Sequence, residues 1–165
     1  MHVGKRSSPC DKLLVHGTIM QEVASDDYLG DIISNDGKIN KNISDKVNKG
    51  NGAANTIISL LAEISFGNYY FEMALLFRNS LLISKMLSSS ETLYNIESQH
   101  INMLEKCDRS LLTRFFNVPF TCSYEAVYLE TGCLPVRYIL KGRRLLYYWT
   151  CLLYTSDAAD DTPCV

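Results

Sequence analysis

The chain has 165 residues, of which 47% are hydrophobic and 21% are charged, and its formal net charge is −2. This length suits one globular domain, which would bury roughly 70% of the surface that the unfolded chain exposes. The balanced charge and ordinary apolar content exclude a disordered charged tail, and the total charge implies no strong electrostatic partner.

The cysteine pattern argues against zinc binding and against a disulfide framework. The chain has six cysteines and three histidines, and no cysteine pair has C-x-x-C spacing. No apolar leader follows Met1, so we expect reduced thiols and an intracellular location, in the cytoplasm or nucleus. The most apolar run, Met73 to Ile83, is interrupted by Arg78 and Asn79 and is shorter than the ~20 residues that span a bilayer. We therefore expect a buried helix there and no membrane partner.

Residues 1–36 have the texture of short strands separated by turns. Apolar runs such as KLLV, TIMQEV and YLGDIIS alternate with turn signals at His16-Gly17 and Asn35-Asp36-Gly37. We expect a hairpin from Leu13 to Val23 and a strand from Tyr28 to Ser34. This part would form a small antiparallel β element.

Beyond Lys38 the apolar residues recur at the period of a helix. The face predicted to pack carries Ile43, Val47, Ala54, Ile58 and Leu61. The opposite face, predicted to be exposed, carries Lys38, Lys41, Lys46 and Lys49. Gly50 and Gly52 each cost about 1 kcal/mol relative to alanine in a helix, so we expect a break or bend near Asn51. Charge alone favours a simply solvated lysine face, with binding of a partner as the alternative.

Three further helical patterns follow. After a loop at Phe66-Gly67-Asn68, the stripe of Tyr70, Ala74, Phe77 and Leu81 predicts a central helix that is apolar nearly all round. A long helix is expected to begin after Ser90, its N-cap, with Glu91 at its positive end, and to reach the turn before Pro119. A short helix is expected between an N-cap at Ser123 and a C-cap at Gly132.

The last helix is predicted to begin at Pro135 and to run to about Trp149. It carries Arg137, Lys141, Arg143 and Arg144, with no acidic residue between Pro135 and Trp149. The expected fold class is mainly α with a small N-terminal antiparallel β element (α+β), in which residues 37–150 form a bundle of four to five helices.

Taken in order, these motifs resemble a known family. The segments are MHVGK, KLLVHGTIMQEV and YLGDIISNDGKINKNI, then GNYYFEMALLFRNSLLISKMLSSSETLY, LEKCDRSLLTRFF and YLETGCLPVRYILKGRRLLYY. Over Met1 to Thr150 the series is similar to the region just after the catalytic core in reverse transcriptases of LINE-type (non-LTR) retrotransposons. In that family the Y-L-G element is the primer grip, a β-hairpin at the boundary of palm and thumb. The helices after it form the thumb and its extension.

The resemblance implies that residues 1–36 are the end of the palm with the primer-grip hairpin, and that residues 37–150 are the thumb-like bundle and its extension. Tyr28, Leu29 and Gly30 would then lie beside the primer end. A rigid hairpin suits that role, because a misplacement of about 1 Å can slow phosphoryl transfer on the order of a hundredfold. The alternative is that Tyr28 and Leu29 are core residues of a sheet.

The partner that the resemblance implies is a template-primer duplex, either RNA–DNA or DNA. Lys41, Lys46 and Lys49 would contact its phosphates, and each such contact adds roughly 0.9 to the salt slope of binding. An RNA–DNA hybrid would be recognised by its shape. Arg143 and Arg144 are a second candidate pair for the backbone, although they could equally cap a helix end or extend from the core to solvent.

In this family the chemistry needs aspartates that hold two Mg²⁺ ions, including the pair of an aromatic-Ala-Asp-Asp turn. That turn should precede Met1, so we expect no catalytic residue, metal site or cofactor in this chain and no activity from it alone. Mg²⁺ is expected only for the full-length parent, whose remaining palm and fingers would be partners. Ala159-Asp160-Asp161 is no substitute, because four residues after it cannot supply a returning strand.

The C-terminal stretch has a separate explanation. CLLYTSDAAD, from Cys151 to Asp160, is what the bases TGT CTC TTA TAC ACA TCT GAC GCT GCC GAC encode. That string resembles the adapter of transposase-tagged sequencing libraries. We expect residues 151–165 to be an adapter-derived, disordered tail.

A second class of function stays open: a helical protein-interaction module with no nucleic-acid role. Coding sequence upstream of the Met1 codon that leads back to an aromatic-Ala-Asp-Asp box would favour the polymerase, whereas a promoter and untranslated leader would favour the module.

Overall fold

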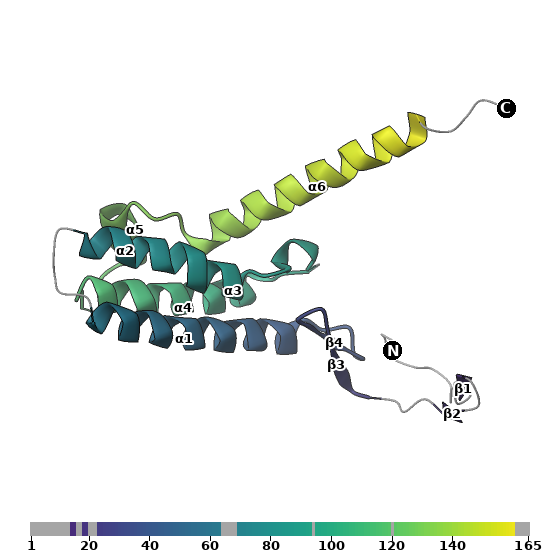
Figure 1. Cartoon of the computed structure of the whole chain (residues 1–165), viewed down its shortest axis with the longest axis horizontal. Coiled ribbons are helices and arrows are strands. Elements are labelled where there is room, and N and C mark those ends of the chain that lie inside the picture. The colour runs from purple at the N-terminus through teal and green to yellow at the C-terminus, as the bar shows by residue number, and fades with distance from the viewer. Residues whose placement is uncertain are drawn as a thin grey trace. The chain divides into compact units, whose positions relative to one another are not determined.

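The computed structural model describes residues 14–15, 18–19, 23–63, 69–93, 95–119 and 121–160 (Figure 1). The described residues are mainly helical and carry a small antiparallel β element near the N-terminus, which confirms the expected fold class. The chain divides into two compact units, Met1–Asp45 and Lys46–Val165. The expected loop at Phe66-Gly67-Asn68 lies outside the described residues.

Two short antiparallel strand pairs make up the β element. Strand β1 (Leu14–Val15) pairs with β2 (Thr18–Ile19), inside the predicted first hairpin. Strand β3 (Ser25–Tyr28) pairs with β4 (Asp31–Ser34). The prediction of one strand from Tyr28 to Ser34 is therefore wrong at its start, because Tyr28 ends β3 and only residues from Asp31 onward form β4.

The link between β3 and β4 is a two-residue turn. Leu29 and Gly30 have φ values of 53° and 84°, and Tyr28 lies directly opposite Asp31 in the register. Positive φ at both central residues is the geometry of a type I′ turn, whose twist matches that of the flanking strands. The Y-L-G motif is thus the tip of a hairpin.

The predicted turn at Asn35-Asp36-Gly37 is confirmed. The Gly37 amide donates to the Ser34 carbonyl at 3.1 Å, and Gly37 has a φ of 71°. The Lys38 amide donates to Asp36 Oδ1 at 3.0 Å. This hydrogen bond, with a second one from Ser34, holds the pKa of Asp36 below its ordinary value. The turn leads directly into helix α1 (Asn40–Ala62).

Helix α1 runs without interruption, so it has no break near Asn51. Gly50 is buried where α1 meets helix α4 (Ser98–Phe115). A Cβ at Gly50 would lie 3.0 Å from Cys107 Sγ, and Cys107 Sγ donates to Asn51 Oδ1 at 3.3 Å. The close approach that glycine allows offsets its helix penalty.

A second long helix is built from α2 (Tyr70–Phe77), the π-helical turn η1 (Arg78–Ile83) and α3 (Ser84–Met86). Its buried side chains include Tyr70, Ala74, Arg78, Leu82 and Met86. The predicted stripe is therefore shifted, since Phe77 and Leu81 are only half-buried. Phe71 is 50% exposed and Leu76 is 57% exposed, so one side of this helix faces solvent.

The expected N-cap at Ser90 is wrong. Ser90 begins only a short 3₁₀ turn, η2 (Ser90–Thr92), and its hydroxyl donates to the Leu87 carbonyl at 2.8 Å. Helix α4 begins at Ser98, where Glu97 and His100 form a capping box. The Glu97 amide donates to His100 Nδ1 at 3.2 Å. Ser90 is thus buried with its hydroxyl bonded to Leu87, and it does not cap the helix as its residue type suggested.

The last two helices begin where predicted. In helix α5 (Tyr124–Thr131) the Ser123 hydroxyl accepts from the Ala126 amide at 3.2 Å, and Gly132 ends the helix with a φ of 64°. Helix α6 (Val136–Asp160) follows Pro135 directly.

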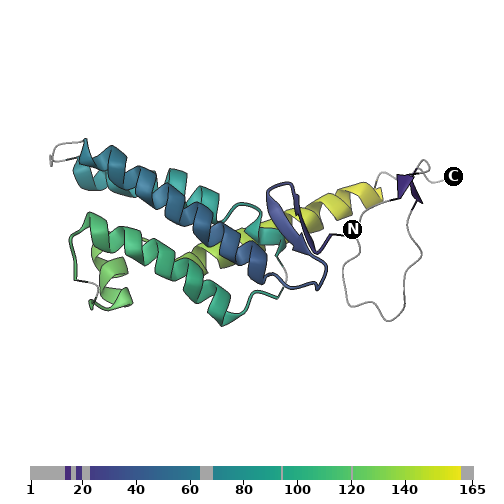
Figure 2. The same ribbon diagram turned by 90° about the horizontal axis from the view of Figure 1, so that it is seen from below.

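Helix α6 is longer than expected. It does not end near Trp149 but continues to Asp160, so the expectation of disorder is wrong for Cys151 to Asp160. No glycine or proline occurs between Arg143 and Asp160 to stop it. Residues 161–165 lie outside the described part. Figure 2 shows α6 extending beyond the other helices of its unit. Among the described residues, no helix is both long enough and apolar enough to cross a bilayer.

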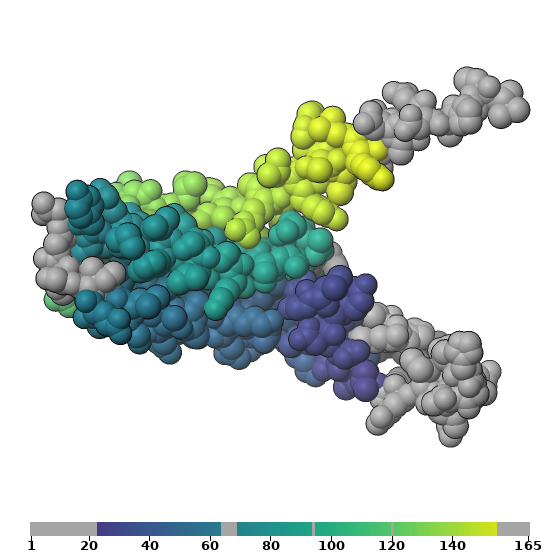
Figure 3. All heavy atoms as spheres, in the orientation of Figure 1, coloured from purple at the N-terminus to yellow at the C-terminus, as the bar shows by residue number. Residues whose placement is uncertain are grey.

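Two ion pairs and a buried hydrogen bond join the helices of the second unit. Arg78 Nε donates to Asp108 Oδ1 at 2.7 Å, and Tyr128 Oη donates to Asp108 Oδ2 at 2.9 Å. On the first turn of α6, Arg137 Nε donates to Glu105 Oε1 at 2.7 Å. These pairs fix α4 to η1, α5 and α6. In the space-filling view α6 rises from the packed helices of its unit as a ridge (Figure 3).

Candidate nucleic-acid interface

The tip of the β3–β4 hairpin is exposed. Tyr28 is 63% exposed and Leu29 is 83% exposed. The alternative that these two residues form a sheet core is therefore wrong. A leucine in the left-handed region costs roughly 1–2 kcal/mol, and the exposed Leu29 gains no burial that would offset this. Costly local geometry of this kind tends to occur at binding sites.

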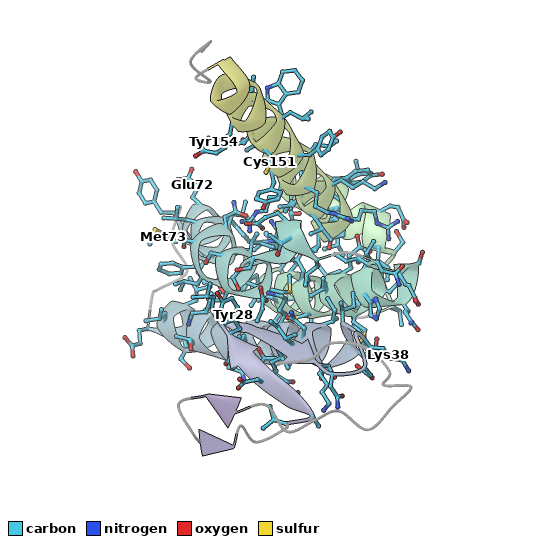
Figure 4. The ribbon with its side chains drawn as sticks, turned by 90° about the vertical axis from the view of Figure 1, so that its right-hand side faces the viewer. Tyr28, Lys38, Glu72, Met73, Cys151 and Tyr154 are labelled. Carbon is cyan, nitrogen blue, oxygen red and sulfur yellow. The ribbon has the colours of Figure 1, made fainter. Side chains whose placement is uncertain are left out.

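The charge near the tip is negative rather than positive. Asp26 and Asp27 are exposed on β3, and a lysine contacts the hairpin at its base. There Lys41 Nζ donates to Ser25 Oγ at 3.4 Å. Tyr28 on the hairpin and Lys38 before α1 lie at opposite sides of the unit Met1–Asp45 (Figure 4). The tip can therefore offer shape and apolar contact, whereas phosphate attraction has to come from the lysines.

Two of the three predicted lysines on α1 are exposed and one is not. Lys41 and Lys49 face solvent, but Lys46 is only 1% exposed and its ammonium donates to the Ser88 carbonyl. The prediction that Lys46 contacts phosphate is wrong. Its position continues the buried stripe that also contains Ile43, Gly50 and Ile57, whereas Val47 is only half-buried.

The exposed side of α1 also carries uncharged polar residues that the charge pattern did not single out. They are Asn48, Asn51, Asn55, Thr56 and Ser59. Thr56 Oγ1 donates to the Gly52 carbonyl at 3.1 Å, and Ser59 Oγ to the Asn55 carbonyl at 3.2 Å. Amide side chains can bond to phosphates and sugars, and such contacts do not read the sequence. Their recurrence every three to four residues was a signal available in the sequence.

The arginine pair of α6 has divided roles. Arg143 is half-buried, and its Nη1 donates at 2.9 Å to the carbonyl of Leu87, the C-cap residue that follows α3. The alternative of helix-end capping therefore describes Arg143. Arg144 is exposed. Lys46 and Arg143 thus hold the neighbouring carbonyls of Ser88 and Leu87, as cations do at the negative end of a helix.

Metal ligands do not converge in the described part of the chain. There, no three histidine, cysteine, aspartate or glutamate side chains come together as a possible metal site. Asp160 ends α6 and Asp161 lies outside the described residues.

No protein-family model matches this chain, and no curated protein or solved structure is significantly similar to it.

Proposed function

We propose that this chain is the primer-grip and thumb region of an RNA-directed DNA polymerase of a LINE-type retrotransposon. In this proposal it holds an RNA–DNA or DNA template-primer duplex inside the cell, in the cytoplasm or nucleus. It would act with the palm and fingers of the parent enzyme, which carry the catalytic aspartates and Mg²⁺.

One observation carries the proposal. An exposed hairpin tip, with Tyr28 and Leu29 held out by a tight turn, is followed after one further turn by a long helix with a polar exposed side. A short, hydrogen-bonded hairpin is stiff enough to position a primer end. Exposed lysine and amide side chains along a helix suit a duplex whose sequence is not read.

Lys41 and Lys49 supply the electrostatic part. Each phosphate contact from a lysine adds roughly 0.9 to the slope of log K against log salt, so the two together contribute about 1.8. Lys46 adds nothing to this slope, since its ammonium is buried against Ser88.

The test is an anisotropy titration of the full chain against an RNA–DNA hybrid at two salt concentrations. Changing Lys41 and Lys49 to alanine should lower the salt slope by about 1.8. The matched control changes Lys85 and Lys106, which are also exposed but lie off α1, and should leave the slope nearly unchanged. No binding, or binding indifferent to salt, would remove the thumb assignment.

The hairpin needs a separate experiment, because its contribution is not electrostatic. Leu29→Asn keeps the turn geometry but removes the exposed apolar side chain. We expect weaker binding of a hybrid with a recessed primer end and unchanged binding of a hybrid with no end near the protein. Equal effects on both probes would show that the tip does not recognise the primer end.

The alternative, a helical protein-interaction module, is supported by exposed apolar side chains. Leu76, Leu129 and Leu134 are each more than half exposed. The titration separates the two functions, because such a module would not bind the hybrid. Coding sequence upstream of Met1 is a second discriminator: a continuous frame back to an aromatic-Ala-Asp-Asp box supports the polymerase.

A further inference from the structure

We propose that the exposed face of α6 binds single-stranded nucleic acid, stacking bases on its aromatic rings and holding phosphates with its cations. The α6 face consists of Tyr138, Lys141, Arg144, Leu145, Tyr148 and Trp149. This surface is separate from the side of α1 proposed to hold a duplex, and this proposal does not depend on that one.

The helical repeat places these residues together. At about 100° per residue, the six fall within roughly 140° of the helix circumference. Val136, Leu140 and Arg143 lie on the other side; Val136 and Leu140 are buried, and Arg143 donates to Leu87. One side of α6 therefore packs onto its own unit and the α6 face does not.

The aromatic rings of this face are open to solvent. Tyr138 is 57% exposed, Tyr148 is 63% exposed and Trp149 is 62% exposed. In Figure 4, side chains with rings project from the α6 ribbon into open space. Tyr138 and Tyr148 are about 15 Å apart along the helix axis, which is room for several stacked or splayed nucleotides between them.

The charge of the α6 face is positive. Lys141 and Arg144 are exposed between the two tyrosines, and no acidic residue occurs on α6 before Asp157. Glu105, on the helix that α6 packs against, forms an ion pair with Arg137 and is buried. Glu91 interacts electrostatically with Tyr147, which lies on the opposite side of α6. The two cations therefore face solvent without a neighbouring carboxylate on the same face of α6.

Rings interleaved with cations favour a single strand over a duplex or an apolar protein partner. A duplex keeps its bases stacked inside and offers no free base face to the tyrosines. A single strand offers both free base faces and phosphates, and stacking accepts any base. An apolar protein partner would match Leu145 and Trp149 but would leave Lys141 and Arg144 without a complement.

The chain carries its own reporter of this binding. Trp149 is the single tryptophan in the sequence and lies on the α6 face. Titrating the full chain with a short oligothymidylate should quench its fluorescence, because a base stacked on or beside an indole quenches the excited state. The salt slope should fall by about 0.7 for each cation removed when Lys141 or Arg144 becomes alanine.

Substitutions of the tyrosines give the sharper result. Tyr138→Ala and Tyr148→Ala should each weaken oligothymidylate binding roughly fivefold or more, while Tyr138→Phe and Tyr148→Phe keep the ring and should bind like the parent chain. The matched control is Tyr69→Ala, which removes an exposed ring at the residue just before α2. All of these positions are exposed, and unchanged circular dichroism would show that folding is unaffected.

Three outcomes would overturn the proposal: no quenching and no binding of the single strand; binding that Tyr138→Ala and Tyr148→Ala leave unchanged; or self-association through Leu145 and Trp149 detected by sedimentation. The Lys41 and Lys49 variant distinguishes this failure from failure of the duplex proposal. It should bind oligothymidylate normally while losing affinity for the hybrid, and the tyrosine variants should show the reverse.

Discussion

Arg78 and Asp108 form a two-bond ion pair at the centre of the helical unit, with Arg78 Nε 2.7 Å from Asp108 Oδ1 and Nη2 2.6 Å from Oδ2. Their side chains are 2% and 0% exposed. Burial works to lower the pKa of Arg78, but the hydrogen bonds and the charge of Asp108 outweigh it and raise that pKa. A buried pair of this kind depends on both partners being present.

The first prediction concerns the loss of either partner. Asp108→Asn and Arg78→Met should each lower the free energy of unfolding by about 3–5 kcal/mol, because each leaves a buried polar group or charge without its partner. Tyr128→Phe removes only one neutral donor to Asp108 and should cost about 1 kcal/mol. Urea unfolding followed by circular dichroism measures all three. The double variant Arg78→Met with Asp108→Asn should lose less than the sum of the two single variants, and strict additivity would contradict the coupling.

The second prediction compares two glycines of the same helix. Nothing lies within 4 Å of a Cβ added at Gly52, so Gly52→Ala should raise the free energy of unfolding by about 1 kcal/mol. Gly50→Ala should lose this gain or reverse it, since its Cβ would lie 3.0 Å from Cys107 Sγ. Adding Cys107→Ala to Gly50→Ala should restore part of the gain. Equal effects of the two glycine substitutions would show that α1 does not pack closely at Gly50.

The third prediction follows from the buried thiol of Cys107. Burial raises the pKa of Cys107 from 9.0 to about 11, with a further contribution from Asp108. Below pH 9 the thiol is protonated in both states. Between pH 9 and 11 the unfolded state releases the proton first, so the stability of the fold should fall by on the order of 2–3 kcal/mol.

Alkaline unfolding curves check this direction. Cys107→Ala should show a shallower decline of stability over that range than the parent chain. Burial also raises the pKa of Tyr128, which adds a loss of the same sign above pH 10 in both proteins. At pH 8 a thiol reagent should modify the exposed Cys151 quickly and Cys107 only on unfolding. Rapid modification of native Cys107 would contradict its burial.

The fourth prediction concerns the conformation of Leu29. Its φ of 53° is costly for leucine and is readily adopted by asparagine. Leu29→Asn should therefore stabilise the β3–β4 hairpin by about 1 kcal/mol. The contrasting variant, Leu29→Val, is β-branched and should weaken it. Amide hydrogen exchange of residues 25–34 reports both, and equal protection in the two variants would argue against a type I′ turn.

Some features were decided by residues close together in the sequence. Ser123 and Gly132 bound α5 because a serine hydroxyl and a glycine at positive φ satisfy the helix ends locally. The turn at Asn35-Asp36-Gly37 formed for the same kind of reason. The fold class, mainly helical with a small β element, followed from the change of hydrophobic period near Lys38.

Other features depended on contacts between distant segments. Lys46 is buried because the Ser88 carbonyl, 42 residues later, accepts a hydrogen bond from its ammonium, and Arg78 is buried because Asp108 lies opposite it on α4. From helical period alone, Lys46 looked like a solvent-facing charge. Ser90 is a residue type that often caps helices, but here its hydroxyl donates to the Leu87 carbonyl in a buried turn.

By itself, the sequence determined where most elements lie and which residues carry charge, because capping, turn geometry and hydrophobic period act over a few residues. Only the tertiary structure decided which charges stay available to a partner. Burial of a cation is stable only where a distant carbonyl or carboxylate meets it, and no local pattern records that meeting. Lys41, Lys49, Lys141 and Arg144 remain exposed, while Lys46, Arg78 and Arg143 hold the helices together.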